Sequence, residues 1–277
     1  MAERFLTDSH CHLDMIRDPA AQVLEQAREA GVERVITIGI DLVSSRGAVA
    51  LAACHDEVYA TVGLHPHDAE QWDAAMASDM RRLAAKERVV AIGECGLDYY
   101  RDLSPRGSQR EAFCGQIELA RRLGKPLVVH IRDAADHALE LLQRHAQGLT
   151  VILHCFSQPD DVEECVERGY FISFAGNVTY KTADDLRKAA RVIPDDRIMV
   201  ETDAPFLTPV PYRGTPNLPQ RVVHTAALLA EIRGEDGRAF AELTTANARR
   251  AFGIPEGGLP RDPGSCEEDE GSLDEEQ

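Results

Sequence analysis

Eight short runs of β-branched and aliphatic residues constrain the fold of this 277-residue chain more than any other feature. The runs show little alternation of apolar and polar residues, which is the pattern of parallel strands buried on both faces. The expected strands cover residues 4–10, 34–40, 58–63, 88–94, 126–131, 150–156, 170–176 and 197–203.

The stretches between these strands have helical spacing. In "AAQVLEQAREAG" and "REAFCGQIELARRLG" apolar residues recur every three or four positions, and a glycine, Gly31 or Gly124, stands at the C-terminal stop. Eight strand-then-helix units predict an α/β fold, a single (β/α)8 TIM barrel. A doubly wound open sheet would typically carry a glycine-rich loop after its first strand, where this chain has "SHCHLD".

No long linker precedes Gly257, so we predict one barrel domain over 1–255 and a tail over 256–277. The tail holds nine acids against one base and is rich in Pro, Gly and Ser, which predicts disorder. The net charge is −17, of which −8 lies in the tail. The remaining charge of −9 argues against binding of nucleic acid by a broad basic patch, but allows a metal and a few arginines to engage phosphates locally.

Composition also predicts the compartment. Hydrophobic residues make up 44% and charged residues 28%, as in ordinary globular proteins. The sequence contains no run of about 18 apolar residues, so we expect no membrane span. The N-terminus lacks a secretory signal pattern, so we expect a cytoplasmic protein. The seven cysteines are odd in number and include no C-x-x-C pair, which argues against a disulfide framework or a structural zinc cage.

Ionisable residues cluster at the C-terminal ends of the expected strands. In a barrel these ends meet at one face, where catalytic groups lie. Such groups are costly to bury unpaired, so the pattern predicts that they hold a divalent cation together. The residues are His10, His12, Glu94, His130, His154, Glu201 and Asp203.

Strand alternation separates the histidines from the neighbouring thiols. His10 and His12 are two residues apart and point to one face, whereas Cys11 points toward the helices. We expect Cys95 and Cys155 to point outward in the same way, which leaves imidazoles and carboxylates as ligands.

The ligand chemistry suits zinc, manganese, iron or, less well, magnesium. Six donors exceed the need of one tetrahedral ion, so we expect two ions per chain with Glu94 as a bridge, an arrangement that serves phosphoester hydrolysis. The six donors are His10, His12, Glu94, His130, His154 and Asp203.

Seven stretches, in order from residue 8 to 253, resemble the TatD family of metal-dependent hydrolases, a group of amidohydrolase-like TIM barrels. They are "DSHCHLD", "VGLHPH", "AIGECGLDYY", "PLVVHIRDA", "ILHCFS", "ETDAPFLTPVPYRG" and "TTANARRAFG". The resemblance implies a divalent-metal-dependent DNase, 3′–5′ exonuclease-like, acting on DNA or nucleic-acid fragments, with its ligands on the same six donors. Cys95, Gln158 and Leu218 depart from the family pattern, and none of them is a donor.

Asp203 and two further residues receive hypothetical roles at the site. A water activated by the ions is expected to attack phosphorus, and Asp203 is expected to orient or deprotonate that water. His65 in "GLHPH" is expected to contact the scissile phosphate rather than an ion. Glu201 is expected to hydrogen-bond within the barrel or to orient a ligand histidine, and it is not assigned a catalytic role.

Four residues are candidate substrate contacts. Arg132 and Arg213 could take up phosphate charge with bidentate geometry. Tyr99 and Tyr100 could stack on a base. For each of the four, a salt bridge or plain packing is the alternative interpretation.

Two other functions compete with the nuclease. An amidohydrolase acting on a cyclic amide or nucleobase often bridges its metals with a carboxylated lysine, but none of the four lysines ends a strand. A non-catalytic scaffold binding partners through its acidic tail would normally have lost a ligand. We expect no membrane partner and favour a monomer.

Overall fold

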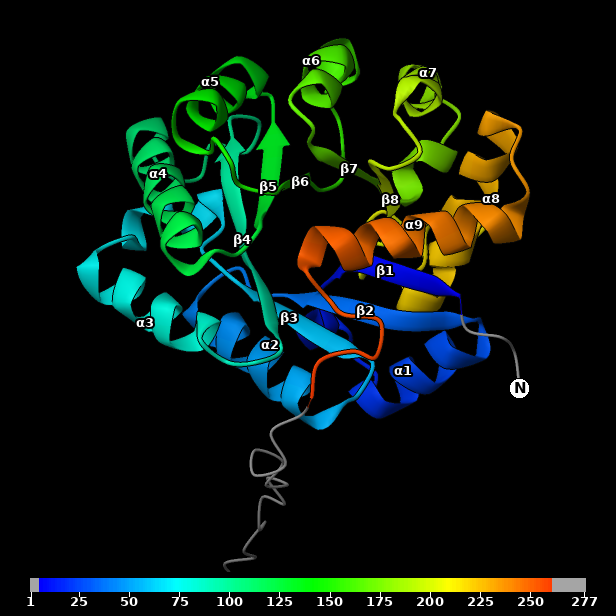
Figure 1. The fold of residues 1–277 in the computed structure, drawn as a ribbon, viewed down its shortest axis with the longest axis horizontal. Helices are drawn as coiled ribbons and strands as arrows, with labels where there is room; N and C mark the ends of the chain where they lie inside the picture. The colour runs from blue at the N-terminus through cyan, green and yellow to red at the C-terminus, as the bar shows by residue number, and fades with distance from the viewer. Residues whose placement is uncertain (1–4, 261–277) are drawn as a thin grey trace, which may run out of the picture.

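The computed structural model describes residues 5–260, and its eight strands form one parallel sheet with neighbours in chain order. This confirms the predicted α/β (β/α)8 barrel (Figure 1). The strands are β1 (Leu6–Cys11), β2 (Val32–Ile38), β3 (Val58–Val62), β4 (Val89–Asp98), β5 (Leu127–Arg132), β6 (Val151–Leu153), β7 (Phe171–Phe174) and β8 (Ile198–Val200).

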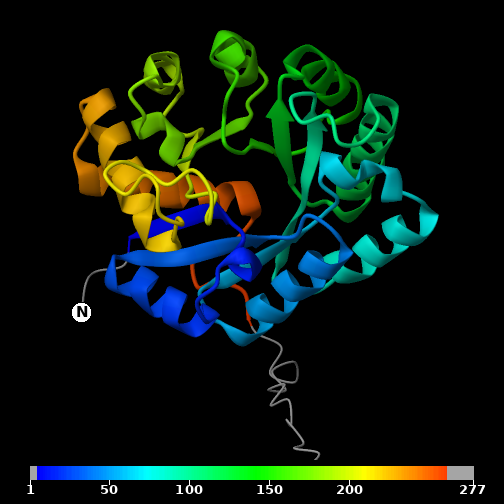
Figure 2. The same ribbon diagram turned by 180° about the vertical axis from the view of Figure 1, so that it is seen from behind.

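Helices surround the strands, as the view from behind also shows (Figure 2). Local sequence sets their ends: α2 begins after a capping box of Asp41 and Ser44, and α4 ends at Gly124 in the left-handed conformation. The helices are α1 (Ala20–Glu29), α2 (Leu42–Cys54), α3 (Ala74–Ala84), α4 (Arg106–Leu123), α5 (Ala135–His145), α6 (Val162–Glu167), α7 (Asp184–Val192), α8 (Val222–Arg233) and α9 (Gly237–Phe252).

The barrel closes where the segment after β8 meets β1. The Asp203 N–H donates to the His10 carbonyl oxygen over 2.9 Å, and the His12 N–H donates to the Ala204 carbonyl oxygen over 2.7 Å. The backbone bonds that close the barrel therefore hold three of the six donors side by side.

All eight strands lie within a few residues of their predicted bounds, and the three that differ by three residues or more at one end are β4, β6 and β8, which carry or precede donors. β4 continues to Asp98 through an irregular register between Ile92 and Cys95, so Glu94 lies inside the strand rather than at its end. β6 and β8 are short, and His154 and Glu201 follow them. Gly96 allows the close approach of β4 to β5, because its φ is +136° and a Cβ there would clash with a carbonyl oxygen of β5.

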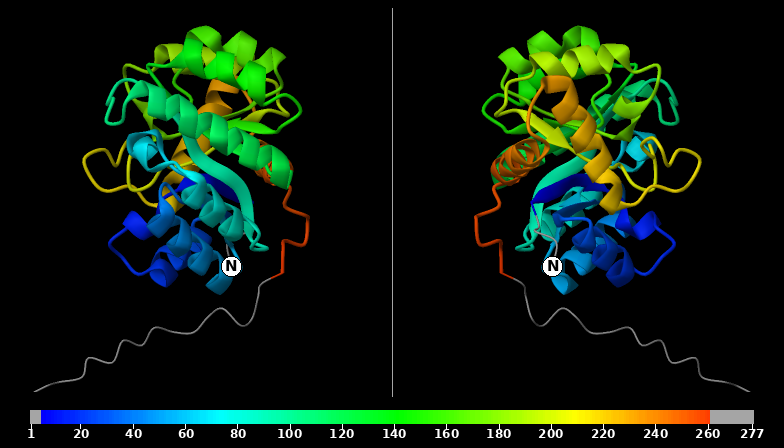
Figure 3. Two further views of the ribbon diagram at one scale, coloured as in Figure 1. Left: turned by 90° about the vertical axis from the view of Figure 1, so that its left-hand side faces the viewer. Right: turned by 90° about the vertical axis from the view of Figure 1, so that its right-hand side faces the viewer.

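The amino end of the barrel is closed by the C-terminal part of the described chain. Phe252 at the end of α9 and Ile254 join Tyr59 in the apolar cluster inside the barrel. Figure 3 shows α9 and the segment that follows it on the side of the barrel opposite the long loop between β8 and α8.

Residues 256–260 lie against the barrel, although the sequence assigns them to the tail. The Leu259 N–H donates to the Tyr59 hydroxyl over 3.3 Å, and Arg88 donates to the Asp56 and Leu259 carbonyl oxygens. The disorder predicted for the rest of the tail falls on residues 261–277, outside the described residues. No helix within 5–260 is both long and apolar enough to cross a membrane.

Candidate metal centre

The six predicted donors meet at the carboxyl end of the barrel. Five of them line a cavity of about 1270 Å³, and His10 lies beneath it, fully buried. The donors come from β1, β4, β5 and the segments that follow β1, β6 and β8, so the fold brings together residues up to 193 positions apart.

Glu94 lies at the centre of this group. Its Oε2 is 3.5 Å from His10 Nε2 and 3.8 Å from His12 Nε2. Its Oε1 is 3.0 Å from His130 Nδ1 and 2.8 Å from His154 Nε2. The two oxygens of one carboxylate therefore face two separate pairs of histidines.

Asp203 lies beside the first of these pairs, His10 and His12. Its Oδ1 is 3.7 Å from His10 Nε2 and 3.5 Å from His12 Nε2. Asp203 has a φ of +55°, a conformation uncommon in residues other than glycine. The chain thus adopts a costly turn at the point where this carboxylate reaches the histidines.

Several buried nitrogen atoms of this group have no hydrogen-bond partner. Within residues 5–260, neither ring nitrogen of His10 has one, nor does Nδ1 of His12. Leaving buried polar groups unpaired is costly, and imidazole and carboxylate donors suit zinc, manganese and iron. The donor set therefore fits a divalent cation.

Carboxylates behind two histidines fix their ring orientation. His130 Nε2 lies 3.2 Å from Asp98 Oδ2, and His154 Nδ1 lies 3.3 Å from Glu201 Oε1. A histidine that donates one N–H to a carboxylate keeps the lone pair of its other nitrogen available for a metal. For His130 and His154 that other nitrogen faces Glu94.

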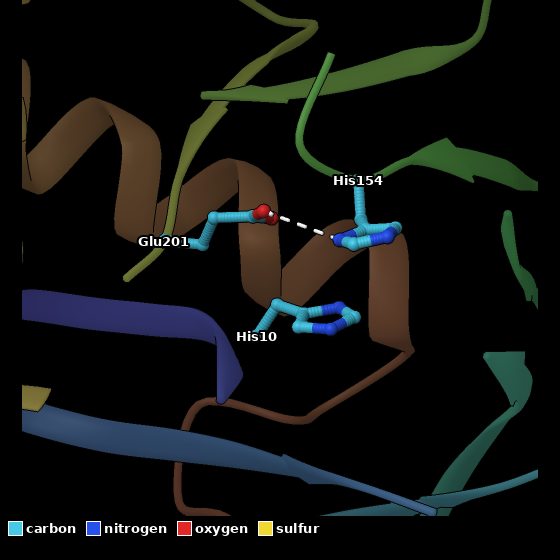
Figure 4. Close-up of side chains that lie close together, drawn as sticks. All are labelled: His10, His154 and Glu201. Carbon is cyan, nitrogen blue, oxygen red and sulfur yellow. Dashed lines mark hydrogen bonds and ion pairs between the residues drawn. The ribbon is translucent and has the colours of Figure 1, made fainter. Parts of the chain in front are cut away.

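Glu201 is fully buried beside the donors. Figure 4 shows its carboxylate directed at the ring of His154. The His154 ring stacks on that of His10, with centroids 3.9 Å apart. Glu201 Oε1 also accepts the Cys155 N–H over 2.8 Å, while Oε2 has no partner within the described residues. Donor atoms of His10, His154 and Glu201 lie within 4.8 Å of one another, so Glu201 is itself a candidate ligand.

The electrostatics of the group centre on the Glu94 carboxylate. Burial raises the pKa of Glu94, but the surrounding histidines, His154 first, outweigh it and lower the pKa well below its usual range. Burial lowers the pKa of His10. Burial also disfavours charge on His154, but the Glu94 and Glu201 carboxylates raise its pKa overall. The carboxylates of this group therefore strongly stabilise positive charge beside Glu94 and His154.

His65 joins the group as a hydrogen-bond donor. Its Nδ1 accepts the His67 N–H over 3.2 Å, and burial lowers its pKa to about 4, so the ring is neutral at pH 7. The remaining proton must then lie on Nε2, which is 3.5 Å from Glu94 Oε1. A protonated nitrogen cannot bind a metal but can donate to an anion.

Asp98 is a member of the site that the sequence analysis missed. Its Oδ2 lies 2.9 Å from His67 Nε2 as well as against His130, and its Oδ1 accepts the Arg101 N–H over 2.7 Å. These contacts lower its pKa although burial opposes the shift. The signal in the sequence is the even spacing from Glu94 to Asp98, which points both side chains to one face of β4.

The predicted substrate contacts fall in different places. Tyr99 and Arg132 line the cavity. Arg213 does not line it; its guanidinium lies over the partly buried Tyr180 ring at 4.1 Å, because stacking on an aromatic ring competes with reaching inward. Tyr100 does not line the cavity either and lies under Arg132 at 4.0 Å.

The three thiols do not all point outward. Cys11 and Cys95 are buried in the apolar cluster between strands and helices, as expected. The expectation for Cys155 was wrong, because β6 ends at Leu153 and Cys155 adopts a φ of +43° that breaks the strand alternation. Its side chain lines the cavity.

Comparison with known proteins places this geometry in a family. Residues 7–253 match the family model described as TatD related DNase. The chain is 40% identical to "Uncharacterized metal-dependent hydrolase TatD" of Mycobacterium tuberculosis over 90% of this chain and 98% of that protein. It is 37% identical to "3'-5' ssDNA/RNA exonuclease TatD" of Klebsiella pneumoniae over 86% and 93%. The crystal structure of the TatD homologue YJJV from Escherichia coli K12 superposes with a TM-score of 0.85 at 29% identity, covering 90% of this chain and 98% of that one.

Proposed function

The chain belongs to the TatD-related DNase family, and we propose that it is a 3′–5′ exonuclease that uses two divalent ions to hydrolyse DNA or nucleic-acid fragments. Family membership makes it a metal-dependent hydrolase of phosphodiester bonds. The observation that carries the two-ion proposal is the Glu94 carboxylate, whose oxygens face two histidine pairs. His10, His12 and Asp203 would hold one ion, His130 and His154 would hold the other, and Glu94 would contribute to both.

Divalent ions held there would neutralise phosphate charge and lower the pKa of a bound water to about 7. The protein supplies orientation and proton transfer. The hydrogen bond from His12 and the charge of His10 keep the pKa of Asp203 low despite burial, so its carboxylate is anionic at pH 7. Asp203 can therefore hold the attacking water in line and accept its proton.

His65 is positioned to donate to a phosphate oxygen. Its neutral ring presents the Nε2 proton beside Glu94 Oε1, and a substrate phosphate is the anion most able to compete for it. Arg132 and Tyr99 on the rim are the candidate contacts for the phosphates and bases beyond the cleaved bond. We leave Arg213 out of this set, because it lies over Tyr180.

The reaction adds one water across the phosphodiester. The water oxygen bonds to phosphorus, the phosphorus–oxygen bond to the leaving nucleoside oxygen breaks, and that oxygen takes a proton. We predict activity near neutral pH, because the pKa values of the Glu94 and Asp203 carboxylates are lowered and both groups are ionised there.

A digestion assay tests this function. Protein stripped with chelator and reloaded with Mn²⁺, Mg²⁺ or Zn²⁺ is given a 5′-labelled single strand with a free 3′ end, a 3′-blocked strand and a circular strand. We expect a ladder shortened from the 3′ end, only with metal and only on the free end. Cleavage of the circle would contradict exonuclease action, and hydrolysis of a panel of cyclic amides and lactones without nucleotide release would favour the amidohydrolase alternative.

A further inference from the structure

The rim of the cavity is divided by chemistry. Among the residues described as lining it, the arginines lie on one side: Arg101 after β4, Arg106 at the start of α4 and Arg132 at the end of β5. Asp133, Asp136, Asp160 and Asp161 line the same side. The segments after β1, β2 and β8 contribute apolar side chains instead: Met15, Ile40, Phe206 and Leu207. Since β8 and β1 lie opposite β4 and β5 in an eight-stranded barrel, the arginine lip and the apolar lip face each other across the six donors.

Phe206 is the most prominent side chain of the apolar lip. It is 51% exposed, although exposure of an aromatic ring forfeits the stabilisation that burial would give. Its ring centroid is 6.0 Å from that of His12, so the ring stands directly beside a donor. Met15 lines the same part of the cavity and is also exposed.

The backbone holds Phe206 at the rim. Its N–H donates to the Asp203 carbonyl oxygen over 2.8 Å, and its carbonyl oxygen accepts from Asn217 Nδ2 over 2.8 Å. Asn217 is fully buried and also donates to the Thr202 carbonyl oxygen, so the anchor belongs to the barrel itself. An exposed ring on a fixed backbone loses little freedom when a flat ligand stacks on it.

Charge determines which part of a nucleic acid each lip suits. The strand that remains after cleavage carries a phosphate at every nucleotide and needs cations, and the arginines described as lining the cavity lie on the arginine lip. A leaving nucleotide at the 3′ end carries no phosphate beyond the scissile one, so its side of the site needs none. The apolar lip offers a ring and a thioether, which match the flat face of a base.

We propose that Phe206, supported by Met15, stacks on the base of the 3′-terminal nucleotide that is removed. This inference rests on the proposed function and adds a site for the leaving nucleotide to it. The site accepts every base, because each has a π-face and the lip presents no side chain that would select one by hydrogen bonding. It also favours a frayed single-stranded end, since a paired terminal base could not turn onto the ring.

Paired substrates test the stacking directly. One labelled single strand ends in 3′-terminal thymidine, and a second of the same length ends in an abasic nucleotide. We expect wild-type protein to cleave the abasic end about tenfold less efficiently in kcat/KM, in the range that one stacked base provides. Phe206→Ala should lose about tenfold on the thymidine end and almost nothing on the abasic end, whereas Phe206→Tyr should keep both rates.

Other results would overturn the inference. Equal efficiency of the wild type on both ends, or an equal loss by Phe206→Ala on both, would show that no base stacks on this ring. The wild-type comparison needs no variant, so it stands even if a substitution perturbs folding, which the thermal midpoint of each variant reports. Failure of wild-type protein to cleave either strand would instead refute the proposed function, which keeps the two failures distinct.

Discussion

The two ends of this barrel are built from the same strands but differ in what they bury. At the amino end, Phe252 and Tyr59 fill the interior, and Leu259 and Arg88 satisfy the hydrogen bonds of that rim. At the carboxyl end, histidines and acids are buried, and neither ring nitrogen of His10 has a hydrogen-bond partner within residues 5–260. The amino end is organised for stability, and the carboxyl end forgoes stability to hold ligands.

Backbone conformation shows the same contrast. Of the five non-glycine residues with positive φ in the described chain, four line the cavity at the carboxyl end: Asp133, Cys155, Asp203 and Leu207. Such conformations cost roughly 1–3 kcal/mol each and persist where the surrounding structure imposes them. Strain in this molecule is therefore concentrated beside the six donors.

Asp203→Asn should abolish catalysis at the carboxyl end without lowering the stability of the fold. We expect turnover to fall at least about 10³-fold, because the amide cannot accept a proton. The thermal midpoint should stay the same or rise in metal-free protein. Rates on a labelled single strand and thermal unfolding measure both effects; substantial remaining activity would exclude Asp203 as the base.

Phe252→Ala should produce the reverse pattern. Removing a buried ring from the amino-end cluster should lower the free energy of unfolding by about 3 kcal/mol, because a cavity remains. The rate per folded molecule should be unchanged. Denaturant unfolding and active-site-normalised rates test this; an equal loss of activity at low temperature would mean that the two ends are coupled.

Asp98→Asn should weaken the carboxyl end without removing a donor. The amide holds the His130 ring less firmly, so we expect metal affinity or activity to fall about 10- to 100-fold. Asp185→Asn on the exposed face of α7 is the matched control and should change neither. Restoration of the Asp98→Asn rate by excess metal would show that the residue acts through ligand positioning.

Leu259→Ala should have the smallest effect. Its side chain is only partly buried against the amino-end cluster, so we expect a loss of about 1 kcal/mol in unfolding free energy. A chain truncated after Pro260 serves as the control and should unfold like the full chain. Loss of stability in that truncated chain alone would assign a structural role to residues 261–277.

The features that could be predicted from the sequence are those that hydrophobic periodicity and the residues at strand ends determine. Buried strands, glycine stops and ionisable residues after apolar runs were enough for the barrel and for the convergence of His10, Glu94 and His154 at one end. Where backbone departs from regular geometry, prediction failed: Cys155 turns inward because its φ is positive, and Asp98 belongs to the site because β4 continues past Glu94. Arg213 lies over Tyr180 and not in the cavity, which the sequence could not show because no pattern reveals which aromatic ring an arginine covers; its contact with substrate stays a prediction.

Metal binding by wild-type protein and Glu94→Gln tests the central claim most directly. Chelator-treated protein is titrated with Mn²⁺ or Zn²⁺ by calorimetry, and activity is followed in the same samples. We predict two ions per wild-type chain, no activity without them, and loss of at least one ion and nearly all activity in Glu94→Gln. Full activity of metal-free protein, or unchanged binding by Glu94→Gln, would contradict a metal centre bridged by Glu94.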